Sequence, residues 1–410
     1  MAATEDEFRV PSMLLRTVAG VCRHWHAAVG TVGSLWTHIA PRIDDGLPSQ
    51  AVQERIARQF AAHISFSRNQ PLHLRMRHDH VPLLRCHLRE LSHRWASMQI
   101  GGYCYDQVAV PLSLRSNALL EDNNTSHIHI MDAAPNLKCL TIRIIGHHYY
   151  RYRARMSYLR AFVPLSASVT SLELTFVGSL WLGNFELEAI ISQCAGTLEE
   201  LRVDIDGQYQ MMAPLALPLL RIVHLHRGAC SLIRALILPS IQAIWLEYAV
   251  RYMHTHAIHG LQDSLKEGLI SGLSLRHLHL SNIILVARQD LEDIVKYTAN
   301  IKMLTLVDIC NDCLVPFSDL FLRILSDTDH NILLPGLQRL NLLRGVQAGS
   351  LSTRTALHNF LIAPYRRQSL VQVVTDVAIN APTVPLFKLI DYKSWDDTVL
   401  DQIALADALL

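Results

Sequence analysis

Cysteine and histidine are the residue types in this sequence whose spacing suggests chemistry. Cys310 and Cys313 form a C-x-x-C pair, a spacing found in zinc sites and redox dithiols. A structural zinc ion needs four ligands, and the sequence has no second such pair at a suitable spacing. Three short clusters, at residues 78–80, 147–148 and 254–256, are rich in histidine but contain no H-E-x-x-H. We therefore expect no metal and no redox cofactor.

The usual signatures of acyl and phosphoryl chemistry do not occur in the sequence. There is no G-x-S-x-G, no G-x-x-x-x-G-K-[ST] and no G-x-G-x-x-G. We expect a protein that is not an enzyme and has no catalytic residue. An enzyme with a histidine and cysteine metal site is the less favoured alternative.

A repeated pattern along the chain must position any functional side chain. Leu275, Leu278 and Leu280 follow the spacing L-x-x-L-x-L, and His277 and His279 alternate with the last two leucines. A period of two in a short run predicts a strand with one buried face. Because a lone strand is unstable in water, copies of this three-position frame must stack on one another.

The frame occurs nine times, at intervals of 21 to 42 residues. The copies are Trp95, Met98 and Ile100; Leu137, Leu140 and Ile142; Val169, Leu172 and Leu174; Leu198, Leu201 and Val203; Leu220, Val223 and Leu225; Ile241, Ile244 and Leu246; the copy at Leu275; Ile301, Leu304 and Leu306; and Leu337, Leu340 and Leu342. Such intervals are typical of leucine-rich repeats, the longer ones carrying helices or loops. The predicted fold class is α/β, a leucine-rich-repeat solenoid with a curved parallel sheet and outer helices.

Apolar spacing between the copies predicts the other elements. We expect a helix over 48–65, a strand over 72–76, a last strand over 370–374 and a capping helix within 382–410. Further helices are predicted over 186–194, 261–270, 289–298 and 316–325, and short connectors over 205–215 and 228–237.

The segment from Leu15 to Trp36 carries a recognisable motif. It contains V-C-R-x-W at Val21, Cys22, Arg23 and Trp25, followed by S-L-W at Ser34, Leu35 and Trp36. This segment resembles the second half of an F-box, in the version found in many fungal F-box and leucine-rich-repeat proteins. The opening L-P-x-E-[IL]-L-x-x-I-F helix of that family is not matched, because only V-P-S-M-L precedes the motif.

The resemblance implies a function. Proteins of this family are substrate receptors of Skp1-cullin-F-box ubiquitin ligases, in which the F-box binds the adaptor Skp1 and the repeats hold a target protein. It assigns the adaptor-binding role to Leu15, Val21, Cys22, Trp25, Leu35 and Trp36. An interaction scaffold with no ligase connection is the alternative, because the opening helix is incomplete.

Alternation along each strand predicts which residues face away from the buried frame, on the concave surface of the solenoid. These residues mix both charge signs with histidine and one tryptophan, the composition expected of a protein-binding face. The predicted target-binding residues are Arg143, Glu173, Arg202, Asp204, His224, His226, Trp245, Glu247, His277, His279 and Arg339. We expect Trp245 to be the exposed anchor, unless the frame slips locally and this ring packs inside.

Composition excludes several classes of partner. Half of the residues are hydrophobic, and 37 Lys plus Arg balance 36 Asp plus Glu. This balance gives no basic excess for nucleic acid or an anionic membrane, so we expect neither as a partner. Glu5, Asp6 and Glu7 stand where a secretory signal would be basic, and eight scattered cysteines suit a reducing compartment. We expect a cytoplasmic or nuclear protein with an F-box-like segment (1–45), a repeat region (46–380) and a C-terminal cap (381–410).

Overall fold

A computed structural model describes most of the repeat region. The described residues are 22–23, 31–40, 50–77, 91–104, 134–146, 168–177, 184–206, 213–247, 256–283, 288–308, 317–326, 334–343, 351–362, 369–379, 384 and 386–389. The chain divides between Leu198 and Glu199 into two compact units. The predicted boundaries at residues 45 and 380 stay predictions.

In unit 1, parallel strands follow one another in chain order. They are β1 (His38–Ile39), β2 (Leu72–Arg77), β3 (Trp95–Cys104), β4 (Cys139–Gly146) and β5 (Ser171–Val177), each paired with the one before it. The helical elements are the 3-10 turns η1 (Gly33–Trp36) and η3 (Ser92–Arg94) and the helices α3 (Gln50–Ser67) and α6 (Asn184–Gln193).

Unit 2 repeats the same arrangement. Its sheet contains β6 (Glu200–Ile205), β8 (Ile222–Arg227), β10 (Ala243–Glu247), β11 (His277–Ser281), β12 (Met303–Val307), β13 (Arg339–Leu343), β14 (Gln372–Thr375) and β15 (Leu386–Leu389). All the pairs are parallel. The short strands β7 (Leu215–Ala216) and β9 (Leu236–Ile237) pair separately.

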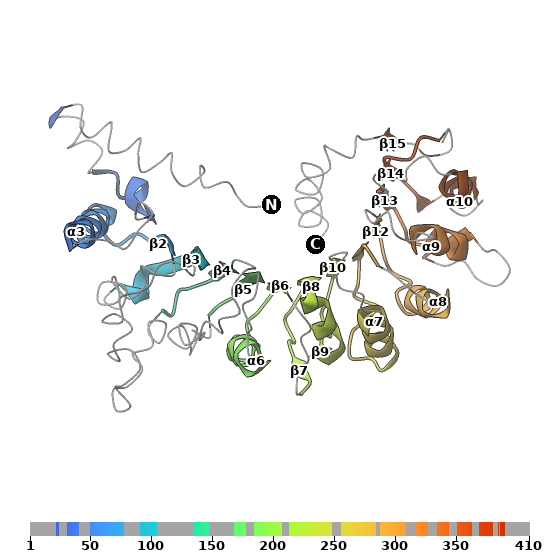
Figure 1. Cartoon of the computed structure of the whole chain (residues 1–410), viewed down its shortest axis with the longest axis horizontal. Coiled ribbons are helices and arrows are strands. Elements are labelled where there is room, and N and C mark those ends of the chain that lie inside the picture. Colours follow the sequence, from blue (N-terminus) through green and yellow to red (C-terminus); the bar gives the residue numbers. More distant parts are fainter. Residues whose placement is uncertain are drawn as a thin grey trace. The chain divides into compact units, whose positions relative to one another are not determined.

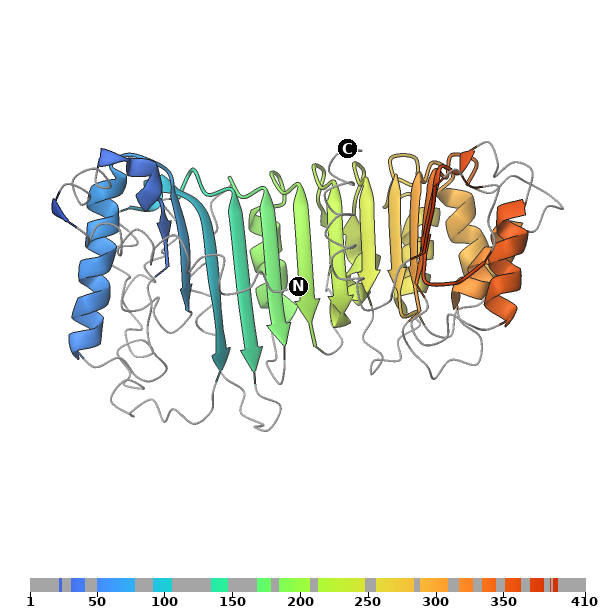
Figure 2. The ribbon, with the colours of Figure 1, turned by 90° about the horizontal axis from the view of Figure 1, so that it is seen from above.

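The helices of unit 2 lie on one side of its strands (Figure 1). They are η5 (Gly228–Ala235), α7 (His256–Lys266), α8 (Arg288–Tyr297), α9 (Phe317–Ser326) and α10 (Leu351–Ile362). Figure 2 shows the strands side by side and pointing the same way. Alternating strands and helices with a parallel sheet confirm the predicted α/β class.

The frame explains why these segments form strands. All nine predicted copies coincide with strands β3, β4, β5, β6, β8, β10, β11, β12 and β13, and every frame side chain is at most 2% exposed. At 25 cal/mol per Å² of buried apolar surface, each buried leucine stabilises the sheet by roughly 1.5–3 kcal/mol relative to an exposed one. The frame face is therefore the core of each unit.

Six strands of unit 2, β8 and β10 to β14, begin with the same pair of backbone hydrogen bonds. The carbonyl oxygen of Gln242 accepts from the N–H groups of Arg276 and His277, at 2.8 and 3.0 Å. The carbonyl oxygen of Arg276 accepts in the same way from Lys302 and Met303, at 2.8 and 3.0 Å. This repeated contact fixes the register, so equivalent residues of successive copies lie side by side.

Most of the other predicted elements are confirmed, with shifted ends. Helices α3, α6, α8 and α9 and strands β2 and β14 lie where they were expected. The helix predicted over 261–270 begins earlier, at His256, and ends at Lys266, two residues before Gly268, whose φ is +74°. Glycine adopts this left-handed conformation without a steric penalty, so it ends the helix.

Two predictions about connections need correction. The connector expected over 228–237 holds the 3-10 helix η5, whose side chains Leu232 and Ile233 are buried. The segment expected to lead into the capping helix contains strand β15. The remainder of that predicted helix, 390–410, lies outside the described residues.

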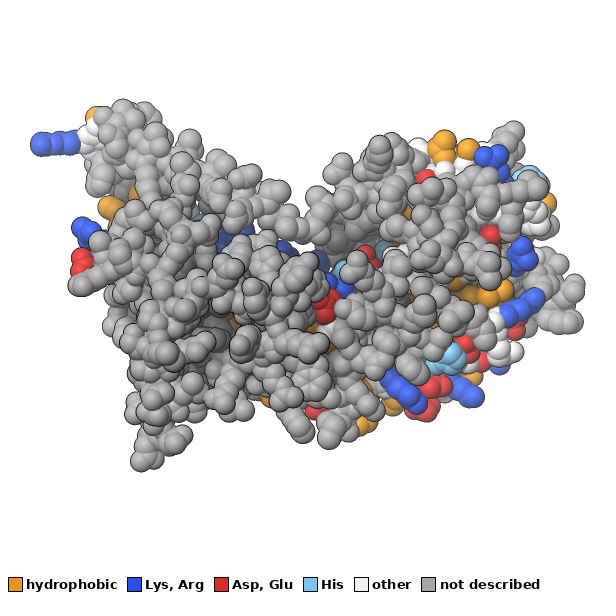
Figure 3. Space-filling view, viewed as in Figure 1, with side chains coloured by type: hydrophobic (Ala, Val, Ile, Leu, Met, Phe, Trp, Pro, Cys, Tyr) orange, Lys and Arg blue, Asp and Glu red, His pale blue; other side chains and the backbone are white. Residues whose placement is uncertain are grey.

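The outer surfaces of α7 and α8 carry charges of both signs, visible at the lower right of Figure 3. Arg288 and Glu292 form an ion pair across one helical turn at 2.5 Å. A mixed charged surface of this kind favours contact with water. Within the described part of the chain, no helix combines the length and apolarity needed to cross a bilayer.

Candidate functional site

The S-L-W motif is built into unit 1 through Trp36. This side chain is buried against helix α3, with ring centroids 4.7 Å from Phe66 and 5.1 Å from His63. The backbone comes close to the same helix at Gly33, where an added Cβ would lie 3.2 Å from the carbonyl oxygen of Ser67. Gly33 leaves room for this close approach, whereas a Cβ there would displace its neighbours by a few tenths of an ångström.

The neighbouring apolar side chains of this motif face outward. Leu35 is 41% exposed and Val32 is 45% exposed, although Trp36 beside them is buried. Cys22 is also exposed. The other predicted adaptor-binding residues, Leu15, Val21 and Trp25, lie outside the described residues.

The chain that follows the S-L-W motif joins the sheet of unit 1. The carbonyl oxygen of Thr37 accepts a hydrogen bond from the N–H of His73 at 2.9 Å, and β1 pairs with β2. The rings of His38 and His73 stack with centroids 4.7 Å apart. The position of Leu35 is therefore fixed by the repeat region.

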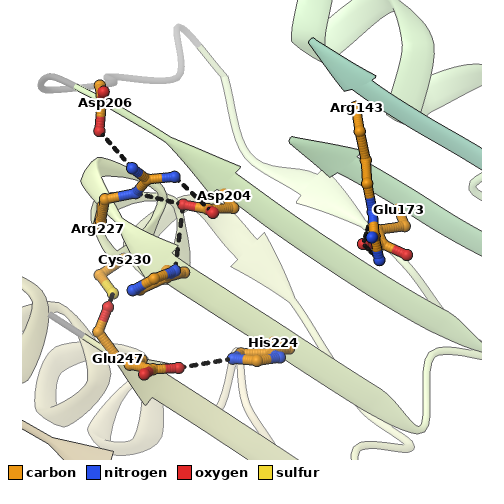
Figure 4. A network of polar contacts seen from close by, with 9 residues as sticks. Arg143, Glu173, Asp204, Asp206, His224, Arg227, Cys230 and Glu247 are labelled. Carbon is orange, nitrogen blue, oxygen red and sulfur yellow. Dashed lines mark hydrogen bonds and ion pairs between the residues drawn. The ribbon is translucent and has the colours of Figure 1, made fainter. Parts of the chain in front are cut away.

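The sheet face away from the frame, here called the opposite face, carries an ion pair in unit 1. Arg143 on β4 contacts Glu173 on β5 through Nε and Nη2, at 2.8 and 2.7 Å from Oε1 (Figure 4). Both side chains are half-buried. The structure thus brings together these two predicted target-binding residues, and their charges neutralise each other.

In unit 2, the strand register arranges the opposite face in rows. One row runs Arg202, His224, Trp245, His279, Thr305 and Asn341, on six successive strands. The next row begins with Asp204, His226 and Glu247 and continues with Ser281. Neighbouring strands of a sheet lie about 4.8 Å apart, so the predicted polar residues are brought together here.

Arg227 at the end of β8 organises the carboxylates of this surface. Its Nε donates to Asp204 Oδ1 at 2.6 Å, and its Nη1 lies 2.9 Å from Asp206 Oδ1 (Figure 4). The backbone of Arg227 has φ +56°, a left-handed conformation that is costly for a residue with a Cβ. This conformation places the guanidinium between the two carboxylates.

Arg227 and Asp206 were not among the predicted site residues. The D-x-D spacing of Asp204 and Asp206 places both on the face that carries the polar row, which is a signal in the sequence. No pattern reveals the left-handed turn at Arg227, because such turns usually fall on glycine or asparagine.

His224 and His226 both lie beside carboxylates. His224 Nε2 is 3.3 Å from Glu247 Oε2, and His226 Nδ1 is 3.2 Å from Asp204 Oδ1. Burial lowers the pKa of His226, but its hydrogen bond to Asp204 and the charge of Glu247 outweigh burial and raise that pKa above its ordinary value. His226 therefore gains a proton more readily than a free imidazole.

The pKa values of the two carboxylates, Glu247 and Asp204, are shifted in the opposite direction, below their ordinary values. Burial raises the pKa of Glu247, but a hydrogen bond with His224 and the charges of His226, His279 and His224 lower it to about 2. Burial likewise raises the pKa of Asp204, and hydrogen bonds with His226 and Arg227 reverse the shift. Both groups are ionised at neutral pH.

Further along unit 2, polar side chains form a buried chain of hydrogen bonds. Arg339 Nε donates to Asn341 Oδ1 at 3.0 Å, and Asn341 Nδ2 donates to Thr305 Oγ1 at 3.0 Å. The same hydroxyl lies 3.3 Å from His277 Nε2. Burial and the nearby charges of His279 and Arg339 lower the pKa of His277 well below its ordinary value, so it is neutral.

The expectation of a freely exposed face is wrong for this part of unit 2. Trp245 is 8% exposed and His279 is 6% exposed, and His277 and Arg339 are also buried. The frame has not slipped, because Trp245 stays in register with His224 and His279. Trp245 is buried because it packs with Ile222, Ala243 and Met303 and contacts the His277 ring edge-on, at 4.7 Å.

Metal chemistry finds no support in the part of the chain that the structure describes. No group of three His, Cys, Asp or Glu residues there is arranged to hold a metal ion. Cys310, Cys313 and the predicted histidine clusters at 78–80 and 147–148 lie outside the described residues. The target-binding roles of the opposite-face residues stay predictions.

The sequence was also compared with known proteins. No protein-family model matches it, and no curated protein matches it either.

Proposed function

We propose that this protein is a substrate receptor of a Skp1-cullin-F-box ubiquitin ligase. In this proposal the protein is a leucine-rich-repeat protein with an F-box-like segment that binds Skp1, and the opposite face of its repeats holds a target protein. Its mechanism is positioning, because holding a target beside a ubiquitin-loaded partner raises the effective concentration of that target. The chain itself supplies no catalytic group.

One observation carries the adaptor-binding part of the proposal. Leu35 projects from the S-L-W motif with 41% of its surface exposed, while Trp36 beside it is packed on α3. An apolar side chain held outward beside a packed ring offers surface whose burial by a partner protein is favourable. Val32 adds to the same exposed apolar surface.

The experiment is a Skp1 binding measurement with two matched variants. Leu35→Asp places a charge in the proposed interface, whereas Leu273→Asp places the same charge on the most exposed leucine among the described residues of unit 2, 74% exposed. We expect wild type and Leu273→Asp to bind purified Skp1 at micromolar concentration and Leu35→Asp to bind at least about tenfold more weakly. Absence of binding by the wild type, or equal binding by both variants, contradicts the proposal.

The alternative is a leucine-rich-repeat scaffold with no ligase connection. The burial of Trp36 against Phe66 and His63 favours it, because this packing alone explains why the motif is present. Under this alternative, the segment simply covers the first strands of unit 1. Wild-type protein that binds no Skp1 but still binds a target would then be the expected result.

A further inference from the structure

The opposite face of unit 2 changes from half-exposed to buried along the sheet. On β6 and β8, the side chains of Glu200, Arg202 and His224 are 26%, 37% and 31% exposed. On β11, β12 and β13, the residues that continue the same two rows are at most 7% exposed. They are called the covered face here: His277, His279, Met303, Thr305, Arg339 and Asn341.

The covered face is buried although no described element lies over it. The described helices of unit 2 lie on the other side of the strands, against the frame (Figure 1). A side chain on the free face of a sheet loses its contact with water only when something packs on that face. Because the burial is present in the chain by itself, a further segment of the same chain is needed as the cover.

The last strand of the sheet indicates which segment is available. Leu386 and Leu389 on β15 are 53% and 55% exposed. Leu386 lies in the row of Arg339, on the opposite face, and Leu389 lies in the row of Leu342, on the frame face. A helix that capped the last strand would bury at least one of the two leucines. Their exposure disfavours the predicted role of residues 390–410 as an end cap.

Residues 390–410 have the sequence pattern of an amphipathic helix. Ser394 is a suitable N-cap, and Asp397 follows it three residues later. Apolar residues recur after it at spacings of three and four, which places them on one helical face. This apolar stripe is Trp395, Val399, Ile403, Ala406 and Leu410.

The length of this segment suits the covered face. A helix of 21 residues is about 30 Å long, whereas the four strand steps from β15 to β11 span about 19 Å at 4.8 Å each. The segment follows β15 directly, and it belongs to the same compact unit as the covered face. A helix that turns back after Leu389 therefore reaches all three strands.

The charge of the segment is also complementary to this face. Arg339 places a guanidinium on the covered face, beside the neutral amide of Asn341, and a buried cation is stabilised by a carboxylate nearby. Residues 390–410 contain five aspartates against one lysine. Asp396 and Asp407 border the apolar stripe, because they stand seven residues before and four residues after Ile403.

We propose that residues 390–410 form an amphipathic helix that packs on the covered face, with the apolar stripe toward the sheet. This internal helix then occupies His277, His279 and Arg339, three of the predicted target-binding residues. The part of the face on β6, β8 and β10 stays open, so a target binds there or displaces the helix. The consequence for the target rests on the proposed function, whereas the placement of the helix does not.

The test uses the full-length protein and diethyl pyrocarbonate, which modifies accessible neutral imidazoles. Peptide mass spectrometry follows His277, His279 and the half-exposed His224 separately at a pH of about 7.5. In the wild type, we expect His224 to be modified at least about tenfold faster than the other two. Equal rates for the three histidines would overturn the inference, because they would mean that nothing covers β11.

Two matched variants test whether residues 390–410 are the cover. Val399→Asp with Ile403→Asp places two charges on the apolar stripe, whereas Ala404→Asp with Ala408→Asp places two charges on the other side of the same helix. We expect the stripe variant to speed modification of His277 and His279 by about tenfold or more and the control variant to leave it within about twofold. Equal rates in the two variants overturn the proposal, since either another segment covers the face or the assigned stripe is wrong.

Hydrogen exchange of β6 and β8 verifies that each variant keeps its fold, and Skp1 binding is measured on the same preparations. Failure of the histidine test with Skp1 binding intact rejects the internal helix alone. Failure of Skp1 binding with the expected histidine pattern rejects the ligase role and leaves a scaffold whose own helix covers part of its sheet.

Discussion

The cysteines differ in reactivity because their surroundings differ. Burial raises the pKa of the Cys194 thiol to about 12, although its backbone hydrogen bond acts in the other direction. Cys230 is also buried, and its Sγ lies 3.1 Å from the carbonyl oxygen of Leu225. Cys139, by contrast, is exposed at the start of β4. Thiol reagents attack the accessible thiolate.

We therefore expect N-ethylmaleimide to modify Cys139 in the native protein at a pH of about 8 and to spare Cys194 and Cys230. Unfolding in urea should make all three reactive. Peptide mass spectrometry after timed labelling measures the three rates separately. Native Cys194 reacting as fast as Cys139 would contradict its burial.

His279 makes the stability of the protein depend on pH. Burial and the charge of His224 lower its pKa to about 4, against the opposing charge of Glu247. Between pH 6.5 and about 4, the His279 imidazole is therefore protonated in the unfolded chain but neutral in the folded chain. Stability falls as the pH decreases through this window. His277 acts in the same direction, and His226, whose pKa is raised, acts in the opposite one.

Replacing His279 should flatten this dependence. We expect the free energy of unfolding of His279→Gln to fall less steeply than that of the wild type between pH 6.5 and 4, by up to about 1.4 kcal/mol per pH unit. Urea unfolding at several pH values gives the slopes. Identical slopes for wild type and His279→Gln would rule out the effect.

At the scale of single elements, the segment that leads into β11 depends on a close backbone contact. A Cβ added to Gly272 would lie 1.9 Å from the carbonyl oxygen of Tyr297. Because backbone cannot move aside as a flexible side chain can, we expect Gly272→Ala to lower the free energy of unfolding by about 1–3 kcal/mol or more. An added Cβ at Gly196 would meet nothing within 4 Å, so Gly196→Ala should be close to neutral in the same urea measurement. Equal stability of both variants would be the contrary result.

The sequence predicts these elements well wherever one buried face dictates them. Leu278 and Leu280 could be assigned to a strand because alternation with His277 and His279 leaves one regular apolar face. The left-handed turn at Arg227 could not be predicted, since its conformation depends on contacts with residues distant in sequence.

Burial on the opposite face was harder to predict than the strands themselves. Trp245 was placed on the correct face, but its exposure was not predictable, because it depends on Met303 and His277 from other copies of the repeat. The alternation of side chains along a strand predicts which face of the sheet a given side chain occupies. It contains no information about what packs over that side chain.

At the scale of the whole molecule, a destabilising substitution in one copy of the repeat should promote unfolding mainly in that copy and its neighbours. Leu278 is fully buried and lies between Ile244 and Leu304 on the neighbouring strands. We expect Leu278→Ala to cost about 2–5 kcal/mol and to speed hydrogen exchange in β10, β11 and β12, since each copy is stabilised mainly by its neighbours. Exchange in β2 and β3 of unit 1 should stay as in the wild type. A uniform increase over both units would show that the chain unfolds as one block.

The whole chain is proposed to connect an adaptor with a target. This role requires the F-box-like segment and the repeats to act in one molecule, with Leu35 available to the adaptor and Glu247 available to the target. The most direct measurement is the mass of the complex formed when the full-length protein is mixed with a preformed Skp1–cullin complex and separated by size-exclusion chromatography with light scattering. We expect one species whose mass is the sum of one copy of each chain, and loss of this species with Leu35→Asp. Separate elution of the wild-type protein and the Skp1–cullin complex would contradict it.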